Sequence, residues 1–217
     1  TRRSSVLSLP TPIARELACL RQGTPIHFSD TNDSAVDYLS SLVFVNDADQ
    51  HLIRGYNSTS FGPQNSLTRF EALTIAMRSN CISGGNSRQF THRNSHFVDV
   101  PQDNSDQSLI IGEAFSRGII TGVGDRFLPD QTVSFAEMVK MLLTSSAYFQ
   151  QGQPLLELNI TLPAARNSVF AQYLQYAYQL GILPNSWDNA SRVNRVTMAE
   201  LLKKYVESTQ LLTMAHN

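Results

Sequence analysis

The sequence predicts a mostly α-helical fold of three helix-turn-helix repeats, arranged around a common axis and preceded by an N-terminal capping helix. Similar segments recur along the chain, apolar residues recur at helical spacing, and helix-start signals stand at equivalent places in the segments. We expect the repeats at residues 25–79, 95–146 and 154–208. The remainder divides into an N-terminal extension at 1–24, linkers at 80–94 and 147–153, and a tail at 209–217.

Composition excludes several classes of protein. The 217 residues carry a formal net charge of -1, with 41% hydrophobic and 16% charged residues. These values fit neither a disordered polyelectrolyte nor a strongly basic nucleic-acid binder. No apolar run approaches the roughly 20 residues of a bilayer-spanning helix. We therefore expect neither a nucleic-acid partner nor a membrane span.

Helix-start signals support the repeats directly. Leu-Thr-Arg-Phe-Glu, Val-Ser-Phe-Ala-Glu and Val-Thr-Met-Ala-Glu occupy residues 67–71, 133–137 and 196–200. The last two lie downstream of Gly-Ile-Ile at 118–120 and Gly-Ile-Leu at 181–183. The spacing is the same in both cases, so the two stretches align without an insertion. Each has a hydroxyl residue three positions before a glutamate, which is the capping-box pattern. The pattern predicts helix starts at Thr68, Ser134 and Thr197, and the apolar stripes that follow each start indicate a core.

A second helix is expected upstream of each cap. The three stretches lie at residues 35–45, 109–117 and 169–180, and Gly118 and Gly181 fit helix C-caps. Turns rich in Gly, Asn, Asp and Pro separate the paired helices, at residues 55–65, 122–131 and 184–195. A further helix is expected from Thr11 to Gly23, packed on the repeats as a cap.

The two cysteines allow two interpretations. Cys19 and Cys81 are an even pair, and a bond between them would close a long loop, contributing roughly 4 kcal/mol in the chain-entropy model. Two buried free thiols are the alternative. If the chain is extracellular, we expect the pair to be bonded.

Several of these motifs resemble the S-layer homology repeat, which is usually found in threes. They are Phe-x-Asp at 28–30 and 97–99, Gly-Tyr at 55–56, Gly-Ile-Ile-x-Gly at 118–122, and Leu-Thr-Arg-Phe-Glu at 67–71, close to the family's Ile-Thr-Arg-Ala-Glu signature. The resemblance covers nearly all of residues 25–208. It implies a pseudo-threefold helical module that binds cell-wall polysaccharide in grooves between repeats, often through a pyruvylated terminal sugar. Such modules anchor surface proteins without covalent bonds.

The resemblance implies carbohydrate-binding residues. Arg69 falls at a helix start, where its charge opposes the helix dipole and an anion would offset it. The N–H groups and the guanidinium suit a carboxylate, whereas the alternative is a surface ion pair with a neighbouring aspartate. The strongest candidate groove joins the first two repeats. It is built from Arg69, Asp99 and the Gly122 backbone, and Asp30 and Gly55 complete the candidate carbohydrate-binding set.

Departures from the family pattern point to an alternative function. The signature arginine is replaced by Phe135 in the second repeat and by Met198 in the third, and residues 158–160 stand where the third Phe-x-Asp is expected. Two of the three grooves are therefore expected to be degenerate. The alternative is a structural subunit of an extracellular lattice or filament, with Phe135 and Met198 at protein contacts.

No enzyme, cofactor or metal is expected. His92 and His96 have a metal-ligand spacing, but the polar residues between them indicate a solvated loop. Capping explains the repeated glutamates, and no nucleophile-base arrangement is recognisable. The expected partners are a cell-wall polysaccharide or peptidoglycan-linked glycan, with self-assembly or a surface-layer protein as further candidates. The chain begins at Thr1 without a basic and apolar leader, as a secreted protein does after removal of its signal peptide; a trimmed chain would begin in the same way. The rarity of lysine also favours an extracellular location, and the resemblance implies the bacterial cell surface or envelope.

Overall fold

Helices make up most of the regular structure, with one small sheet beside them. The computed structural model describes residues 19–82, 95–150, 162, 168–188 and 190–214. The helices are α2 (Ser34–Ser41), α3 (Arg69–Ser79), α4 (Asp106–Ser116), α5 (Phe135–Thr144), α6 (Ala147–Gln150), α7 (Ala171–Gln179) and α8 (Arg195–Met214). The antiparallel sheet has the order β1-β2-β3, with strands β1 (Leu20–Gln22), β2 (Leu42–Phe44) and β3 (Asp47–His51).

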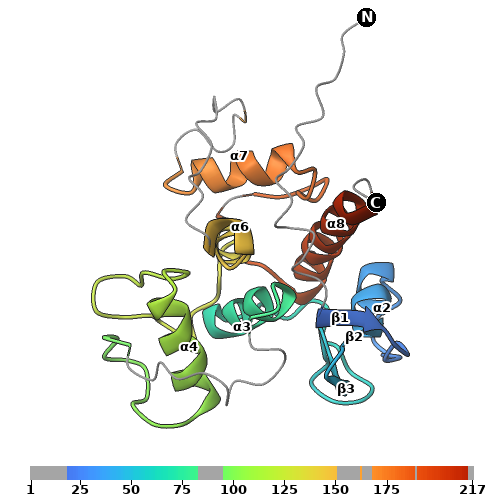
Figure 1. Cartoon of the computed structure of the whole chain (residues 1–217), viewed down its shortest axis with the longest axis horizontal. Coiled ribbons are helices and arrows are strands. Elements are labelled where there is room, and N and C mark those ends of the chain that lie inside the picture. The colour runs from blue at the N-terminus through green and yellow to red at the C-terminus, as the bar shows by residue number, and fades with distance from the viewer. Residues whose placement is uncertain (1–18, 83–94, 151–161, 163–167, 189, 215–217) are drawn as a thin grey trace, which may run out of the picture.

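Helix α3 lies near the middle of the molecule. In Figure 1, α4 lies on one side of α3, the sheet and α2 lie on the other, and α7 lies beyond α6. Helix α3 packs against α5, α2 against α8, and α5 against α7. The buried apolar side chains of these elements form one continuous core.

The sheet corrects the expectation that the N-terminal part is wholly helical. The helix predicted at residues 35–45 ends at Ser41, and the chain continues as β2. Leu42, Val43 and Phe44 are all buried, and such a short apolar run is compatible with either a helix or a strand when only its sequence is known. The helix predicted from Thr11 to Gly23 is also wrong at its end, because Leu20–Gln22 form β1; residues 11–18 lie outside the described part.

Two predicted capping boxes are confirmed and the third is wrong. Thr68 with Glu71, and Ser134 with Glu137, make both reciprocal bonds. Helix α8 instead begins at Arg195, and the side chain of Asn194 accepts the Thr197 N–H at 2.8 Å. A cap at Thr197 would start the helix at Met198, whereas α8 starts three residues earlier, at Arg195. The reason is that the turn before α8 is shorter than its counterparts.

A closed ring of backbone hydrogen bonds joins the segments that precede α3, α5 and α8. The Leu67 N–H donates to the Val193 carbonyl at 2.9 Å, the Val133 N–H to Leu67 at 3.0 Å, and the Val193 N–H to Val133 at 3.1 Å. All three side chains are buried. Each segment donates to one neighbour and accepts from the other, so the three helix starts are held side by side.

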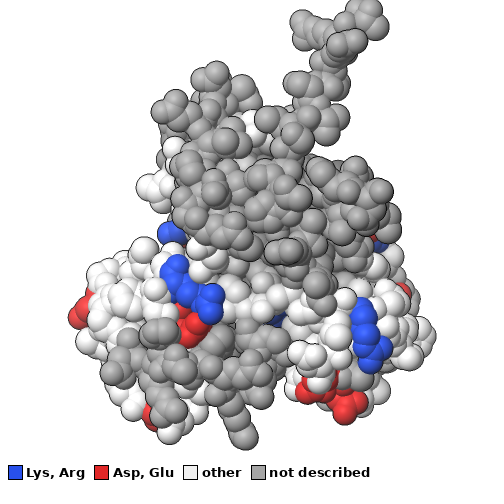
Figure 2. Space-filling model, viewed as in Figure 1, with Lys and Arg blue, Asp and Glu red and all other residues white. Residues whose placement is uncertain are grey.

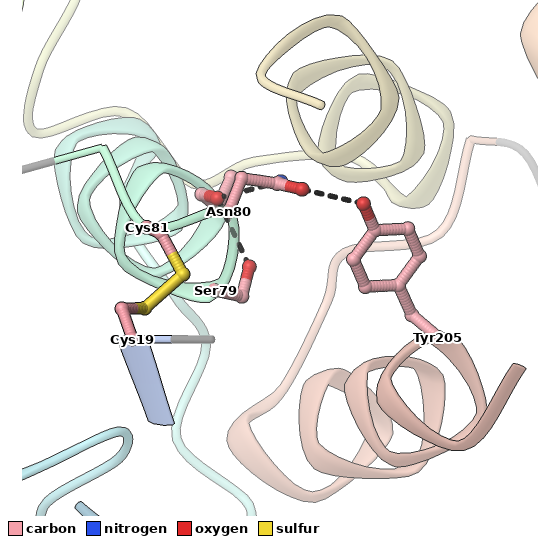
Figure 3. The surroundings of a disulfide bond; sticks show 6 residues. Cys19, Ser79, Asn80, Cys81 and Tyr205 are labelled. Atoms are coloured by element: carbon pink, nitrogen blue, oxygen red, sulfur yellow. Dashed lines mark hydrogen bonds between the residues drawn. A yellow bond between two sulfur atoms is a disulfide. The ribbon is translucent and has the colours of Figure 1, made fainter. Parts of the chain in front are cut away.

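A buried polar cluster joins the C-terminal ends of α3 and α5 to the middle of α8. The Asn80 Nδ2 group donates to the Ala76 carbonyl and the Leu142 carbonyl, both at 3.0 Å. The Tyr205 hydroxyl donates to the Asn80 Oδ1 atom at 2.5 Å, as Figure 3 shows. Asn80 therefore links the end of α3 to α5 and α8 within the core.

A disulfide lies beside this cluster. Cys19 and Cys81 are bonded, with their Cα atoms 5.8 Å apart, which ties the start of β1 to the end of α3 (Figure 3). Cys81 has a φ of 59°, in the left-handed region that Gly118 and Gly181 occupy after α4 and α7. A cysteine at this glycine-type position places its thiol where the disulfide forms.

Charged groups are sparse on the surface. On the face shown in Figure 2, the described Lys, Arg, Asp and Glu side chains form small groups among uncharged residues, without an extended patch of one sign. Of the helices in the described part, none is both long and apolar enough to pass through a bilayer.

Candidate functional site

The Arg69 side chain is buried at the start of α3. Only 6% of the residue is exposed. Its Nε donates to the Phe127 carbonyl at 2.9 Å, its Nη1 forms an ion pair with Glu137, and its guanidinium lies 5.1 Å from the centre of the Phe127 ring. The expected surface ion pair with an aspartate is therefore wrong, because the partner is a glutamate of another helix and the pair is largely shielded from solvent.

Arg69 lines a cavity of about 250 Å³, which we call the first groove. The other residues around it come from the turn after α4, from α5 and from the segment before α7: they include Gly122, Glu137, Lys140, Met141 and Phe170. The structure thus brings together Arg69 and Gly122, two of the residues predicted to bind carbohydrate. Asp99, Asp30 and Gly55 do not line this cavity.

Gly122 is required by close packing. Its φ is 70°, and an added Cβ would lie 2.2 Å from the Phe97 ring. Gly55 is packed in the same way, because a Cβ there would lie 2.5 Å from the Phe28 ring. Both glycines let an aromatic side chain pass directly against the backbone of a turn.

Asp30 and Asp99 hold the turns that follow these glycines. Asp99 accepts the N–H groups of Phe127 at 2.9 Å and Leu128 at 2.8 Å, and Asp30 accepts those of Phe61 and Gly62, each at 2.8 Å. Burial alone would raise the pKa of Asp99, but its two N–H donors lower the pKa below its ordinary value. The pKa of Asp30 is lowered chiefly by its own N–H donors. The two carboxylates thus act as turn-holding acceptors.

Lys140 is a cationic residue of the first groove that the sequence motifs did not identify. It is half-buried on α5, and its Nζ lies 6.0 Å from the centre of the Tyr173 ring. Burial lowers the pKa of Lys140, the charge of Arg69 lowers it further, and the Glu137 carboxylate opposes this. The only available signal was the position of a rare lysine one turn after the Glu137 of a capping box.

A second buried arginine occupies the same position at the start of α8. Arg195 is 7% exposed; its Nε donates to the Phe61 carbonyl at 2.7 Å, and its guanidinium lies 4.5 Å from the centre of the Phe61 ring. These contacts match those of Arg69 with Phe127. The prediction that Met198 replaces the arginine is therefore wrong, and the error comes from the three-residue shift in the helix start.

Arg195 lines a cavity of about 210 Å³, which we call the second groove. The residues around it come from the segment after β3, from α3 and from α8: they include Ile53, Arg54, Glu71, Arg78 and Met198. Glu71 and Arg195 here take the places that Glu137 and Arg69 take in the first groove. The expectation of a single cationic groove is therefore corrected to two.

At the start of α5 an aromatic pair stands in place of the arginine. Phe135 is 1% exposed and stacks on Trp187, with ring centroids 5.4 Å apart and planes at 24°. Trp187 precedes Val193 by the same interval at which Phe127 precedes Val133. Since Phe135 and Met198 are both buried within the chain, their assignment to lattice contacts is wrong.

Comparison with protein families finds one related domain. The model of the S-layer homology domain matches residues 49–73 and 103–139. The chain is thus similar to S-layer homology domains over these two segments. The first matched segment includes Arg69, and the second includes Gly122 and Glu137, so the first groove lies between S-layer homology segments. Among curated proteins, no significant match is found.

The S-layer homology match points to a general functional class. Domains of this family are cell-wall and cell-surface anchoring modules, and the match is consistent with a surface-anchoring role. Within the described residues, no cluster of three or more His, Cys, Asp or Glu side chains could hold a metal ion. His96 packs against Phe97 and Phe115, and His92 lies outside the described part.

Proposed function

We propose that the chain is a non-catalytic cell-surface module that binds cell-wall polysaccharide in the first groove and thereby anchors a surface protein or layer. The observation that carries the proposal is the cavity of about 250 Å³ in which Arg69 and Lys140 meet beside the Gly122 backbone. It contains two cations and one carboxylate, Glu137. A glycan that carries a carboxylate, such as a pyruvate ketal on a terminal sugar, would balance this charge.

The groove has donors available for such a ligand. Arg69 uses its Nε and Nη1 atoms within the chain, and its Nη2 atom makes no hydrogen bond with the described residues. The Lys140 Nζ atom also has no hydrogen-bond partner among them. Arginine and lysine side chains form charge-assisted hydrogen bonds with the carboxylate of a ligand, and such bonds are stronger than neutral ones. A bound anion would also favour the charged form of Lys140.

We also propose that three repeats surround a pseudo-threefold axis, at the residue ranges predicted above. The closed ring of hydrogen bonds through Leu67, Val133 and Val193 supports this arrangement. The first residue of each following helix also reaches the turn of the next segment in cyclic order: Arg69 contacts Phe127, Phe135 contacts Trp187, and Arg195 contacts Phe61. The first groove then lies between repeats one and two.

A sedimentation assay with purified cell-wall sacculi tests the proposed function. The chain is mixed with sacculi before and after chemical removal of ketal-linked pyruvate, and the bound fraction is measured. Lys140→Met is the informative variant, because it removes a charge from the groove without touching the contacts that hold Arg69. Lys203→Met is the matched control on α8, outside the groove.

The expected result is retained binding by the control and about a tenfold loss of affinity for Lys140→Met, since tenfold corresponds to about 1.4 kcal/mol. Removal of pyruvate should weaken the wild-type chain to a similar degree. Binding of folded Lys140→Met at wild-type strength would contradict the assignment of the first groove. Binding of the wild-type chain that is unchanged after pyruvate removal would contradict the proposal of a carboxylate-bearing ligand.

A further inference from the structure

The second groove has an excess of positive charge that the described residues lining it do not balance. Three guanidinium groups line it, from Arg54, Arg78 and Arg195, together with one carboxylate, Glu71. Glu71 already accepts the Thr68 N–H at 2.8 Å as part of the capping box. By formal charge, the first groove has an excess of one positive charge and the second an excess of two.

The Arg54 and Arg78 side chains contact backbone carbonyls. Arg54 donates to the Asp49 carbonyl at 2.5 Å, and Arg78 donates to the His51 carbonyl. The Arg78 guanidinium also lies 5.1 Å from the centre of the Phe44 ring. Neither side chain has a carboxylate within ion-pair distance among the described residues. Carbonyls and a ring orient the two guanidinium groups but do not neutralise them.

The local environment makes this arrangement costly when the groove holds no anion. Burial lowers the pKa of Arg78 to about 10, and the positive charge of Arg54 contributes to the same shift. Leu52, Ile53 and Ile75 form apolar walls of the cavity. Electrostatic interactions are stronger beside such walls than in open water, so both the repulsion between arginines and their attraction for an anion are increased.

We propose that the second groove binds a doubly charged oxyanion of the phosphate monoester class, held by Arg54 and Arg78, at a site separate from the carbohydrate site of the first groove. A phosphate monoester carries close to two negative charges at neutral pH, which matches the excess charge of the groove. Arginine forks bind phosphate oxygens in a bidentate manner. The cavity of about 210 Å³ accommodates a phosphate group with a small substituent.

Calorimetric titration of the purified chain with two small probes tests the site. Methyl phosphate provides the dianion and sodium acetate the monoanion, both at pH 7.5 and at equal ionic strength. The variants are Arg54→Gln and Arg78→Gln. Arg192→Gln removes an exposed arginine outside the groove, and Lys140→Met removes a cation of the first groove.

Methyl phosphate should bind at least about tenfold more tightly than acetate, and each groove variant should weaken methyl phosphate about tenfold, as expected for the loss of one charge-assisted contact. Arg192→Gln and Lys140→Met should bind it as the wild type does. Because Arg54 is exposed, its variant remains informative if Arg78→Gln fails to fold.

Three results would overturn the proposal: no measurable binding of methyl phosphate, equal affinity for the two probes, or unchanged binding in Arg54→Gln. A loss of binding in Lys140→Met, with Arg54→Gln unaffected, would place the anion in the first groove instead. Since the sacculus assay depends on Lys140 and this one on Arg54, failure of either proposal can be recognised separately.

Discussion

Replacement of Arg69 by alanine should destabilise the fold strongly. In the sequence this arginine stands at a helix start, where its charge opposes the helix dipole, and such a residue is expected to contribute little to stability. The structure reverses that expectation. The side chain is 6% exposed, donates to the Phe127 carbonyl 58 residues away, and forms an ion pair with Glu137.

The magnitude follows from what the substitution leaves behind. The buried Phe127 carbonyl loses its donor, which costs about 1–3 kcal/mol. Glu137 loses its cationic partner, but its side chain is 26% exposed and keeps its capping bonds, so this loss lies below the roughly 3–5 kcal/mol of a fully buried pair. These terms overlap because both describe one side chain, and relief at the helix dipole returns a few tenths of a kcal/mol. We therefore expect a net loss of about 2–4 kcal/mol in the free energy of unfolding.

Urea unfolding followed by circular dichroism measures this loss. The matched control is Lys203→Ala, because Lys203 forms an i,i+4 pair with Glu207 at 4.0 Å on the surface of α8. Surface pairs contribute about 0–1 kcal/mol, so the control should shift the unfolding midpoint little. A loss below about 1 kcal/mol for Arg69→Ala would refute the view that the buried pair joins α3 to α5.

Three further predictions concern residues that hold the turns and the helix starts. Gly122→Ala should lower the free energy of unfolding by about 3 kcal/mol and Gly124→Ala by only about 1 kcal/mol. Both glycines have a left-handed φ, but only at Gly122 does an aromatic ring occupy the space of the new Cβ. Equal urea midpoints for the two variants would contradict this. Because the pKa of Asp99 is lower in the folded chain, the contribution of Asp99 to stability is present above the unfolded pKa of 3.8 and is lost as the pH falls below that value. The free energy of unfolding of Asp99→Asn should therefore vary less with pH between about 5 and 2 than that of the wild type. An unchanged pH profile would count against the turn-holding role. Phe135→Ala should lower the free energy of unfolding by about 3–5 kcal/mol. It should also shift the fluorescence emission of Trp187, the single tryptophan, to longer wavelength, and an unchanged emission maximum in the folded variant would rule out the stacked pair.

The sequence predicted the helix starts best where the signal is local. A capping box depends on two residues three positions apart, so Thr68 with Glu71 and Ser134 with Glu137 could be recognised without any tertiary information. The same rule failed at Thr197, where the pattern recurs by coincidence one turn inside α8. The turn before α8 is shorter, and a gapless alignment could not detect this.

The candidate site was predicted in part. Arg69 and Gly122 line the first groove as expected, but Asp99 and Asp30 are engaged by the N–H groups of their own turns. Lys140 was missed because no motif marks it. Arg195 was missed because its equivalence to Arg69 becomes visible only when both are seen to contact the carbonyl of an equivalent aromatic residue.

The sequence by itself determined most of the helical segments, where two of those helices begin, and where glycine is needed after α4 and α7. These features depend on bonds between residues a few positions apart. Only the tertiary structure decided the small sheet, the start of α8 and the burial of both arginines. The partners in these cases lie far along the chain, as with Arg195 and the carbonyl of Phe61, 134 residues away. Whether a cation at a helix start faces solvent or a buried carbonyl depends on which turn packs against it, and that is set by the closed ring of contacts among Leu67, Val133 and Val193.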